Sequence, residues 1–87
     1  MNLKKKNLAI IGLGYVGLPL AVEFSKKYKV VGFDLDNTRI EELHNNFDRT
    51  RELTKKELKN SKCLEFSSNK ESLEGIDIFI VTVPTPI

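Results

Sequence analysis

The chain has 87 residues, of which 40 % are hydrophobic and 30 % charged, and its formal net charge is +2. A chain of this length forms at most one small domain, and its composition excludes disordered and collagen-like classes. Positive and negative residues are interleaved. The one run of three basic residues, Lys4-Lys5-Lys6, has no aromatic platform beside it, so no nucleic-acid partner is expected.

The sequence does not support a membrane span, a disulfide or a metal cluster. No apolar run approaches the roughly 20 residues of a membrane span, and Leu8–Ile11 is too short for the core of a signal peptide. We therefore expect a cytoplasmic protein. The single Cys63 excludes an intramolecular disulfide and a cysteine-based metal cluster, and we expect it to be a small core or strand-edge residue. His44 stands alone on the exposed end of a predicted helix and is assigned no chemistry.

The first third of the chain alternates short apolar runs with helical periodicity. Residues Asn7–Ile11 form an apolar run that ends at a glycine, which predicts a buried strand. From Val16 to Tyr28 apolar residues follow a helical period, with Pro19 near the first turn, where a missing N–H is tolerated best. Lys29–Phe33 is then a second buried strand.

The middle of the chain predicts two short helices. Asp36 or Asn37 can cap the first helix, which ends near Asn45-Asn46, with Ile40, Leu43 and Phe47 as its inward-facing residues. Residues 47–53 read as a loop. Thr54 and Glu57 match a capping box, which predicts a second helix through about Asn60.

The last third predicts two more strands around a short helix. Leu64–Ser67 alternates apolar and polar residues, as a half-buried strand near a sheet edge does. Residues 68–74 form a predicted helix of one to two turns, with Ser68 and Glu71 as its capping box and Gly75 as its end. Ile76–Val83 is the most hydrophobic stretch and stops at Pro84.

Strands that alternate with helices imply a parallel sheet with right-handed crossovers. The usual doubly wound connection would place the four strands in the order 3-2-1-4. We therefore predict an α/β fold with three layers, consisting of a first β-α-β-α-β half and a fourth strand.

The segment Gly12-Leu13-Gly14-Tyr15-Val16-Gly17 is a G-x-G-x-x-G pattern. The pattern is informative here because it follows a predicted strand and opens a helix, which is typical of a Rossmann-type dinucleotide site. The first glycine permits the tight turn, the second lets a pyrophosphate approach the backbone, and the third lets the helix pack against the sheet. Tyr15 and Val16 supply amides at the positive end of that helix. The alternative is a close-packed turn without a ligand.

Asp34 ends the second strand about 20 residues after the glycines, where a carboxylate accepts the ribose hydroxyls of the adenosine. The same carboxylate repels a 2′-phosphate, so NAD is favoured over NADP. Arg39 keeps NADP possible as the cofactor, since a nearby arginine can bind a 2′-phosphate. Because Asp34 is present, we expect Arg39 to pack on the adenine or contact the ribose instead.

The run Val81-Thr82-Val83-Pro84-Thr85-Pro86 lies at the carboxyl end of the fourth strand, beside the point where ligands bind in open α/β sheets. The Thr85 hydroxyl is a candidate donor to the cofactor. The alternative is a strand terminator flanked by prolines.

Three segments, Ile11–Ala21, Gly32-Phe33-Asp34 and Val83-Pro84-Thr85-Pro86, closely resemble the nucleotide-sugar 6-dehydrogenases of the UDP-glucose/GDP-mannose dehydrogenase family. The resemblance covers essentially the whole chain. Asp48–Leu53 is similar to the branch that oxidises UDP-N-acetylhexosamines to uronic acids for bacterial surface polysaccharides.

This resemblance implies cofactor contacts at Tyr15, Val16, Asp34, Arg39 and Thr85. It also implies two successive NAD-dependent oxidations, from the C6 alcohol to the acid, through a thioester on a cysteine that lies beyond this chain. Cys63 matches no family nucleophile, so we expect no catalytic residue among residues 1–87 and regard them as a partial NAD-binding domain. The nucleotide sugar would bind only to the full-length enzyme.

Two other functions remain open at this point. One is a free-standing dinucleotide-binding sensor or regulatory module. The other is the start of a different oxidoreductase, such as a hydroxyacid or 6-phosphogluconate dehydrogenase, against which the Pro-Thr-Pro segment argues. The apolar stretch Ile76–Val83 would be an exposed edge on this chain, and we expect a homo-oligomer.

Overall fold

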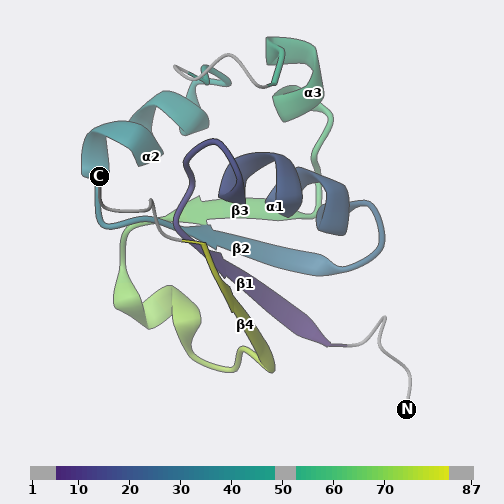
Figure 1. Cartoon of the computed structure of the whole chain (residues 1–87), viewed down its shortest axis with the longest axis vertical. Coiled ribbons are helices and arrows are strands. Elements are labelled where there is room, and N and C mark those ends of the chain that lie inside the picture. Colours follow the sequence, from purple (N-terminus) through teal and green to yellow (C-terminus); the bar gives the residue numbers. More distant parts are fainter. Residues whose placement is uncertain (1–5, 49–52, 83–87) are drawn as a thin grey trace.

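The computed structural model describes residues 6–48 and 53–82, and in this part of the chain four strands form one parallel sheet (Figure 1). The elements in chain order are β1 (Asn7–Ile11), α1 (Gly17–Ser25), β2 (Lys29–Phe33), α2 (Asn37–His44), α3 (Lys55–Lys59), β3 (Leu64–Ser67), the 3-10 helix η2 (Lys70–Leu73) and β4 (Ile78–Val81). The strand order is β3-β2-β1-β4, which confirms the predicted topology.

The main hydrophobic core lies on one face of the sheet, because alternate residues of a strand point to the same side. Leu8 and Ile10 of β1 share this core with side chains from all three α-helices. The helical members of the core are Leu18, Ala21 and Val22 of α1, Ile40 and Leu43 of α2, and Leu58 of α3. The helices α1, α2 and α3 therefore cover the same face.

The connection from β3 to β4 crosses the sheet in the opposite direction to the earlier connections. A right-handed crossover consequently places η2 on the other face. There Ala9 and Val31, which are paired in the β1–β2 register, are 0 % and 9 % exposed. This arrangement gives the predicted third layer, which is thin because η2 is short.

Two of the predicted helix caps are confirmed. The Asp36 side chain accepts hydrogen bonds from the Thr38 and Arg39 amides at 3.0 and 3.2 Å, and it begins α2. Thr54 and Glu57 form the reciprocal capping box of α3. Because these bonds satisfy amides that a helix leaves free at its first turn, short helices become stable at these positions.

Two predictions about local structure are wrong. The first turn of η2 is capped by Asn69 instead of Ser68, because the Asn69 side chain accepts the Glu71 amide at 3.0 Å. Phe47 was expected to face inward but is 51 % exposed. The cause is Asn46, whose φ of 59° turns the chain out of the helical period directly before Phe47.

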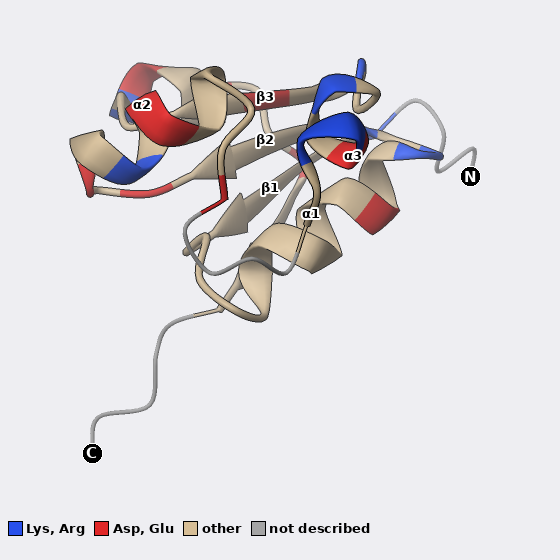
Figure 2. Ribbon diagram, turned by 90° about the horizontal axis from the view of Figure 1, so that it is seen from above, with Lys and Arg blue, Asp and Glu red and all other residues tan. Residues whose placement is uncertain are grey.

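The strand β4 is shorter than the predicted Ile76–Val83, and residues 83–87 lie outside the described residues. Figure 2 shows more acidic than basic positions along the ribbon of α2 and more basic than acidic ones along α3. Cys63 is exposed and directly precedes β3.

Within residues 6–48 and 53–82 no helix is long and apolar enough to cross a membrane. In the same part of the chain, no group of three or more His, Cys, Asp or Glu could hold a metal ion.

Candidate functional site

The glycine turn joins the carboxyl end of β1 to the start of α1 and faces outward. Its first glycine, Gly12, donates its N–H to the Phe33 carbonyl at 2.8 Å, which attaches the turn to β2. Gly12 has a φ of +96°, a region that residues with a Cβ avoid. At the tip, Tyr15 and Val16 are 69 % and 67 % exposed. The predicted amide donors therefore lie at the surface.

The three glycines of the turn differ in what surrounds them. A Cβ on Gly12 would overlap the Thr82 carbonyl oxygen, and a Cβ on Gly17 would overlap both the Gly12 carbonyl oxygen and Thr82 Oγ1. A Cβ on Gly14 would meet no atom within 4 Å. The first and third glycines therefore serve close packing. The second borders open space, as the approach of a ligand requires.

The N-terminus of α1 is a suitable anion site. The helix has nine residues and begins at Gly17, and its N-cap residue Val16 makes no side-chain capping bond. Leu18 donates its N–H to the Gly14 carbonyl at 3.3 Å and Pro19 has no N–H, so a ligand would meet the amides that precede Leu18. Uncapped first-turn amides and the helix dipole together favour a negatively charged group. A pyrophosphate placed over Gly14 would meet these amides.

Asp34 is half-buried at the end of β2 and lies against the glycine turn. Its Oδ2 accepts the Leu13 amide at 2.9 Å, and its Oδ1 accepts the Asp36 amide at 2.9 Å. An ionised carboxylate has about four acceptor positions, so two remain for ribose hydroxyls. The neighbouring Leu35 is 73 % exposed and offers an apolar surface beside the carboxylate.

Arg39 does not lie in the solvent beside Asp34 but is buried beneath the turn, with 4 % of its surface exposed. Its Nε donates to the Leu13 carbonyl at 2.8 Å, and its Nη1 lies 2.9 Å from Asp48 Oδ1. A direct contact with a cofactor would require the guanidinium to leave both partners. The predicted contact of Arg39 with the ribose or adenine stays a prediction.

Thr82 is the residue of this site that sequence reasoning missed. Its Oγ1 donates to the Gly12 carbonyl at 2.8 Å, with the Ile11 carbonyl as a second acceptor at 3.2 Å. The parallel β1–β4 register pairs Ile11 with Val81 and so brings the next residue, Thr82, to the turn. A polar residue at the end of an apolar strand was the available signal. The predicted donor Thr85 lies outside the described residues.

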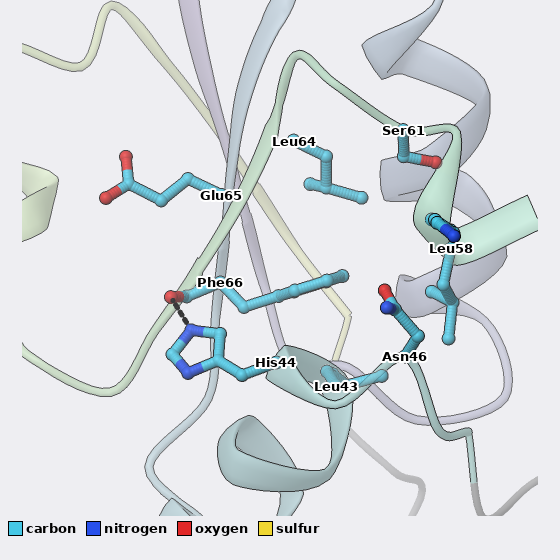
Figure 3. A pocket seen from close by; sticks show the side chains of 9 residues that line it. Leu43, His44, Asn46, Leu58, Ser61, Leu64, Glu65 and Phe66 are labelled. Atoms are coloured by element: carbon cyan, nitrogen blue, oxygen red, sulfur yellow. Dashed lines mark hydrogen bonds between the residues drawn. The ribbon is translucent and has the colours of Figure 1, made fainter. Parts of the chain in front are cut away.

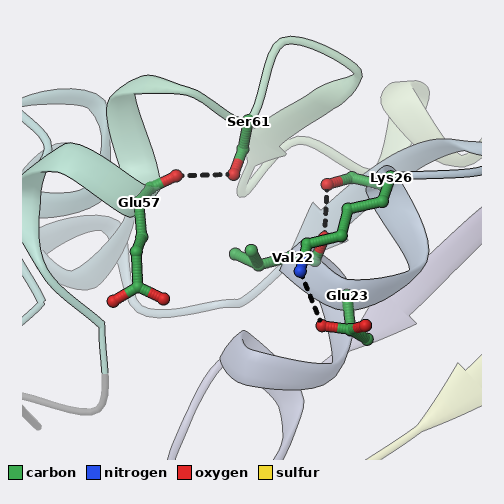
Figure 4. Close-up of polar contacts among 6 residues, drawn as sticks. Val22, Glu23, Lys26, Glu57 and Ser61 are labelled. Atoms are coloured by element: carbon green, nitrogen blue, oxygen red, sulfur yellow. Dashed lines mark hydrogen bonds and ion pairs between the residues drawn. The ribbon is translucent and has the colours of Figure 1, made fainter.

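Two of the hollows among the described residues that lie away from this turn are the following. One, of about 350 Å³, opens between α2, α3 and β3, where His44 Nε2 is 2.9 Å from the Phe66 carbonyl (Figure 3). The other lies between α1 and α3, beside the Lys26–Glu23 ion pair and the bond from Ser61 Oγ to the Glu57 carbonyl (Figure 4). Neither is lined by the glycine turn or by Asp34. They therefore do not belong to the candidate site.

A parallel sheet in the order β3-β2-β1-β4, a glycine turn at its switch point and a carboxylate at the end of β2 together define a Rossmann-type dinucleotide-binding domain. Residues 6–87 match the model of the UDP-glucose/GDP-mannose dehydrogenase family, NAD binding domain. The chain belongs to this family, and NAD is its cofactor.

Similar proteins agree with this assignment. Protein CapL from Staphylococcus aureus is 55 % identical over 82 residues, which cover 94 % of this chain and 19 % of CapL. The UDP-N-acetyl-D-glucosamine 6-dehydrogenase of Pseudomonas aeruginosa is 53 % identical over 85 residues, which cover 98 % of this chain and 20 % of that enzyme. The structure of a UDP-D-ManNAc dehydrogenase from Pyrococcus horikoshii superposes with a TM-score of 0.87 at 32 % identity, covering 93 % of this chain and 21 % of that one.

The chain thus spans about a fifth of the length of these relatives. The family match confirms the resemblance found in the sequence. It supports a dehydrogenase rather than a free-standing sensor or regulatory module.

Proposed function

We propose that this chain holds NAD across the glycine turn. The pyrophosphate lies over Gly14 against the amides of Tyr15 and Val16, and Gly12 and Gly17 give the turn its shape. Asp34 accepts the adenosine ribose hydroxyls. The observation that carries the proposal is the bond from the Leu13 amide to Asp34 Oδ2, because it fixes the ribose carboxylate beside the uncapped start of α1.

The same geometry favours NAD over NADP. A 2′-phosphate would stand against the Asp34 carboxylate, and both its charge and its bulk would oppose binding. The exposed Leu35 gives the adenine an apolar surface to pack on. Thr85 remains a proposed hydroxyl donor to the cofactor.

For the whole protein we propose oxidation of the C6 alcohol of a UDP-N-acetylhexosamine to the uronic acid in two NAD-dependent steps, in the cytoplasm, for surface polysaccharide synthesis. The activities of the relatives, which include UDP-N-acetyl-D-glucosamine 6-dehydrogenases, support this proposal. When bound, NAD would supply the hydride acceptor for each oxidation. The present residues bind and orient it, whereas the catalytic cysteine and the sugar site belong to the longer protein. Cys63 precedes β3, at the amino ends of the parallel strands, whereas the glycine turn lies at their carboxyl ends.

Calorimetric titration of the chain with NAD⁺ and NADP⁺ tests the cofactor site. We expect NAD⁺ to bind more tightly, and Asp34→Asn to weaken NAD⁺ binding and reduce the preference. The asparagine keeps an acceptor for the Leu13 amide but loses the charge. Glu65→Gln, on the exposed surface of β3, is the control for a lost carboxylate. Absence of binding by folded wild-type chain, or an unchanged preference in Asp34→Asn, would contradict the proposal.

The activity is tested on the longer protein that carries this chain. With UDP-N-acetylglucosamine or UDP-N-acetylmannosamine and NAD⁺, we expect two molecules of NADH for each sugar oxidised. The chain alone should produce none. Failure to reduce NAD⁺ with either sugar would remove the substrate proposal and leave the cofactor site intact.

A further inference from the structure

The peptide unit between Gly12 and Leu13 is held from both sides by side chains that follow the neighbouring strands. On one side the hydroxyl of Thr82, which follows β4, donates to the Gly12 carbonyl at 2.8 Å. On the other side the Leu13 amide donates at 2.9 Å to Oδ2 of Asp34, which follows β2. The carbonyl and the N–H of a trans peptide lie in one plane and point in opposite directions. A single rigid group therefore connects the Thr82 hydroxyl to the Asp34 carboxylate.

The Thr82 hydroxyl bonds to the Gly12 carbonyl in preference to its second acceptor. The Ile11 carbonyl lies 3.2 Å from Thr82 Oγ1, and it already accepts the Thr82 amide at 2.7 Å. A hydroxyl has one proton, so the shorter contact, with Gly12, takes it. A Cβ on Gly17 would overlap both the Gly12 carbonyl oxygen and Thr82 Oγ1. On the side of α1 a water molecule therefore has no room to replace the hydroxyl.

The orientation of this peptide depends on its hydrogen-bond partners, because one of its two residues is a glycine. Gly12 has a φ of +96° and no Cβ, so the peptide unit that follows it rotates at low cost. Turned over, the peptide would direct its carbonyl oxygen at the Asp34 carboxylate and remove the Leu13 donor from it. The bond to Thr82 opposes this rotation. One of the two amides that Asp34 accepts is therefore held in place by the Thr82 hydroxyl.

We propose that Thr82 is a positioning residue of the cofactor site: its hydroxyl holds the Gly12–Leu13 peptide, and the peptide orients the Asp34 carboxylate toward the adenosine ribose. The inference rests on the proposed NAD site and adds a residue that acts through the glycine turn. A carboxylate that is already oriented binds ribose hydroxyls more tightly than a mobile one, because less conformational entropy is lost on binding. The Thr82 hydroxyl thus acts on recognition of the ribose hydroxyls in particular.

The nucleotide arm of the test compares ADP with 2′-deoxy-ADP, which share the pyrophosphate and differ in one ribose hydroxyl. NMR titration of the full chain gives the two dissociation constants and their ratio. We expect the wild-type chain to prefer ADP. Thr82→Val should reduce this preference by about fivefold, the effect of one hydrogen bond, and Thr82→Ser should keep it. A general loss of structure would weaken both nucleotides by the same factor and leave the ratio unchanged.

Ser61→Ala is the matched control. It removes another hydroxyl that donates to a backbone carbonyl at 2.8 Å, that of Glu57, at a place away from the turn. We expect this variant to keep the wild-type preference for ADP, because its lost bond does not touch the Gly12–Leu13 peptide.

A second arm needs no nucleotide. Hydrogen exchange of the Leu13 amide, followed by NMR, is compared with that of the Val30 amide, which is bonded to the Cys63 carbonyl at 2.9 Å. Thr82→Val should speed exchange at Leu13 by about fivefold or more relative to Val30. Thr82→Ser and Ser61→Ala should keep the wild-type ratio of the two exchange rates.

An unchanged preference for ADP, or unchanged relative exchange at Leu13, in folded Thr82→Val would overturn the proposal. Equal binding of both nucleotides by the wild-type chain would do the same. If Thr82→Val does not fold, Thr82→Cys takes its place, since a thiol is only a weak donor. Equal values in Thr82→Cys and Thr82→Ser would then overturn the proposal. If the wild-type chain binds neither nucleotide, the NAD site fails in this chain, and exchange at Leu13 still decides the role of Thr82.

Discussion

At the scale of single residues, we expect one glycine of the turn, Gly17, to contribute to stability and another, Gly14, to ligand binding. Gly17→Ala places a methyl group against the Gly12 carbonyl and Thr82 Oγ1, and neither backbone nor strand end can easily give way. We expect it to lower the free energy of unfolding by about 1–3 kcal/mol, the range for overpacking. Gly14→Ala meets no protein atom, so stability should change little while NAD⁺ binding weakens. Urea unfolding and calorimetry measure the two effects.

Each variant serves as the control for the other, since both add one methyl group to the same turn. Gly14→Ala that bound NAD⁺ as tightly as wild type would show that the pyrophosphate does not approach the backbone there. Unchanged stability of Gly17→Ala would mean that the contacts with Gly12 and Thr82 relax at no cost.

The residues predicted from the sequence are those whose role depends on local spacing. The glycine pattern and Asp34 follow from their distances along the chain to the predicted strands, and the structure brings them together. Thr82 could not be assigned in this way, because its contact with Gly12 depends on the parallel register of strands 70 residues apart. The burial of Arg39 was also missed, since it requires Asp48 to return to the turn after α2.

At the scale of elements, α2 depends on its N-terminal cap. The helix has eight residues, which is too short to be stable in isolation, and Asp36 satisfies two of its first-turn amides. Asp36→Ala should lower the free energy of unfolding by about 1 kcal/mol, and Asp36→Asn should recover most of the loss. Urea unfolding of both variants gives the comparison. Equal stability of Asp36→Ala and wild type would show that packing of Ile40 and Leu43 alone holds the helix.

The helix caps were predictable to within one residue. Asp36 and Thr54 directly precede helical patterns, and both cap them as expected. The failure at Ser68 arose because Asn69, one residue later, is an equally good cap and accepts the Glu71 amide. The inward position predicted for Phe47 failed because one residue with positive φ, Asn46, ends the helical period. Sequence patterns locate these helices but leave their ends uncertain by a residue.

At the scale of the whole molecule, the two edges of the described sheet differ in character. The edge strand β3 carries the exposed, charged Glu65. The edge strand β4 has the sequence Ile-Phe-Ile-Val, and its Phe79 and Val81 are 51 % and 64 % exposed. Beside it, Leu8, Phe24, Tyr28, Ile78 and Ile80 line an apolar hollow of about 190 Å³. An uncharged edge with free backbone groups readily pairs with another chain, whereas charged edges resist pairing.

We therefore expect this chain to self-associate through β4, and Phe79→Lys to weaken that association. The lysine places a charge where two β4 strands would meet, and its burial there would be unfavourable. Sedimentation velocity over a range of concentrations should show the dissociation constant rising by about tenfold or more. Glu65→Lys, at the β3 edge, introduces a lysine on the opposite side of the sheet and should leave association unchanged. A wild-type chain that stays monomeric at high concentration would rule out association through this edge. Equal weakening by both variants would point to general charge repulsion instead of pairing at β4.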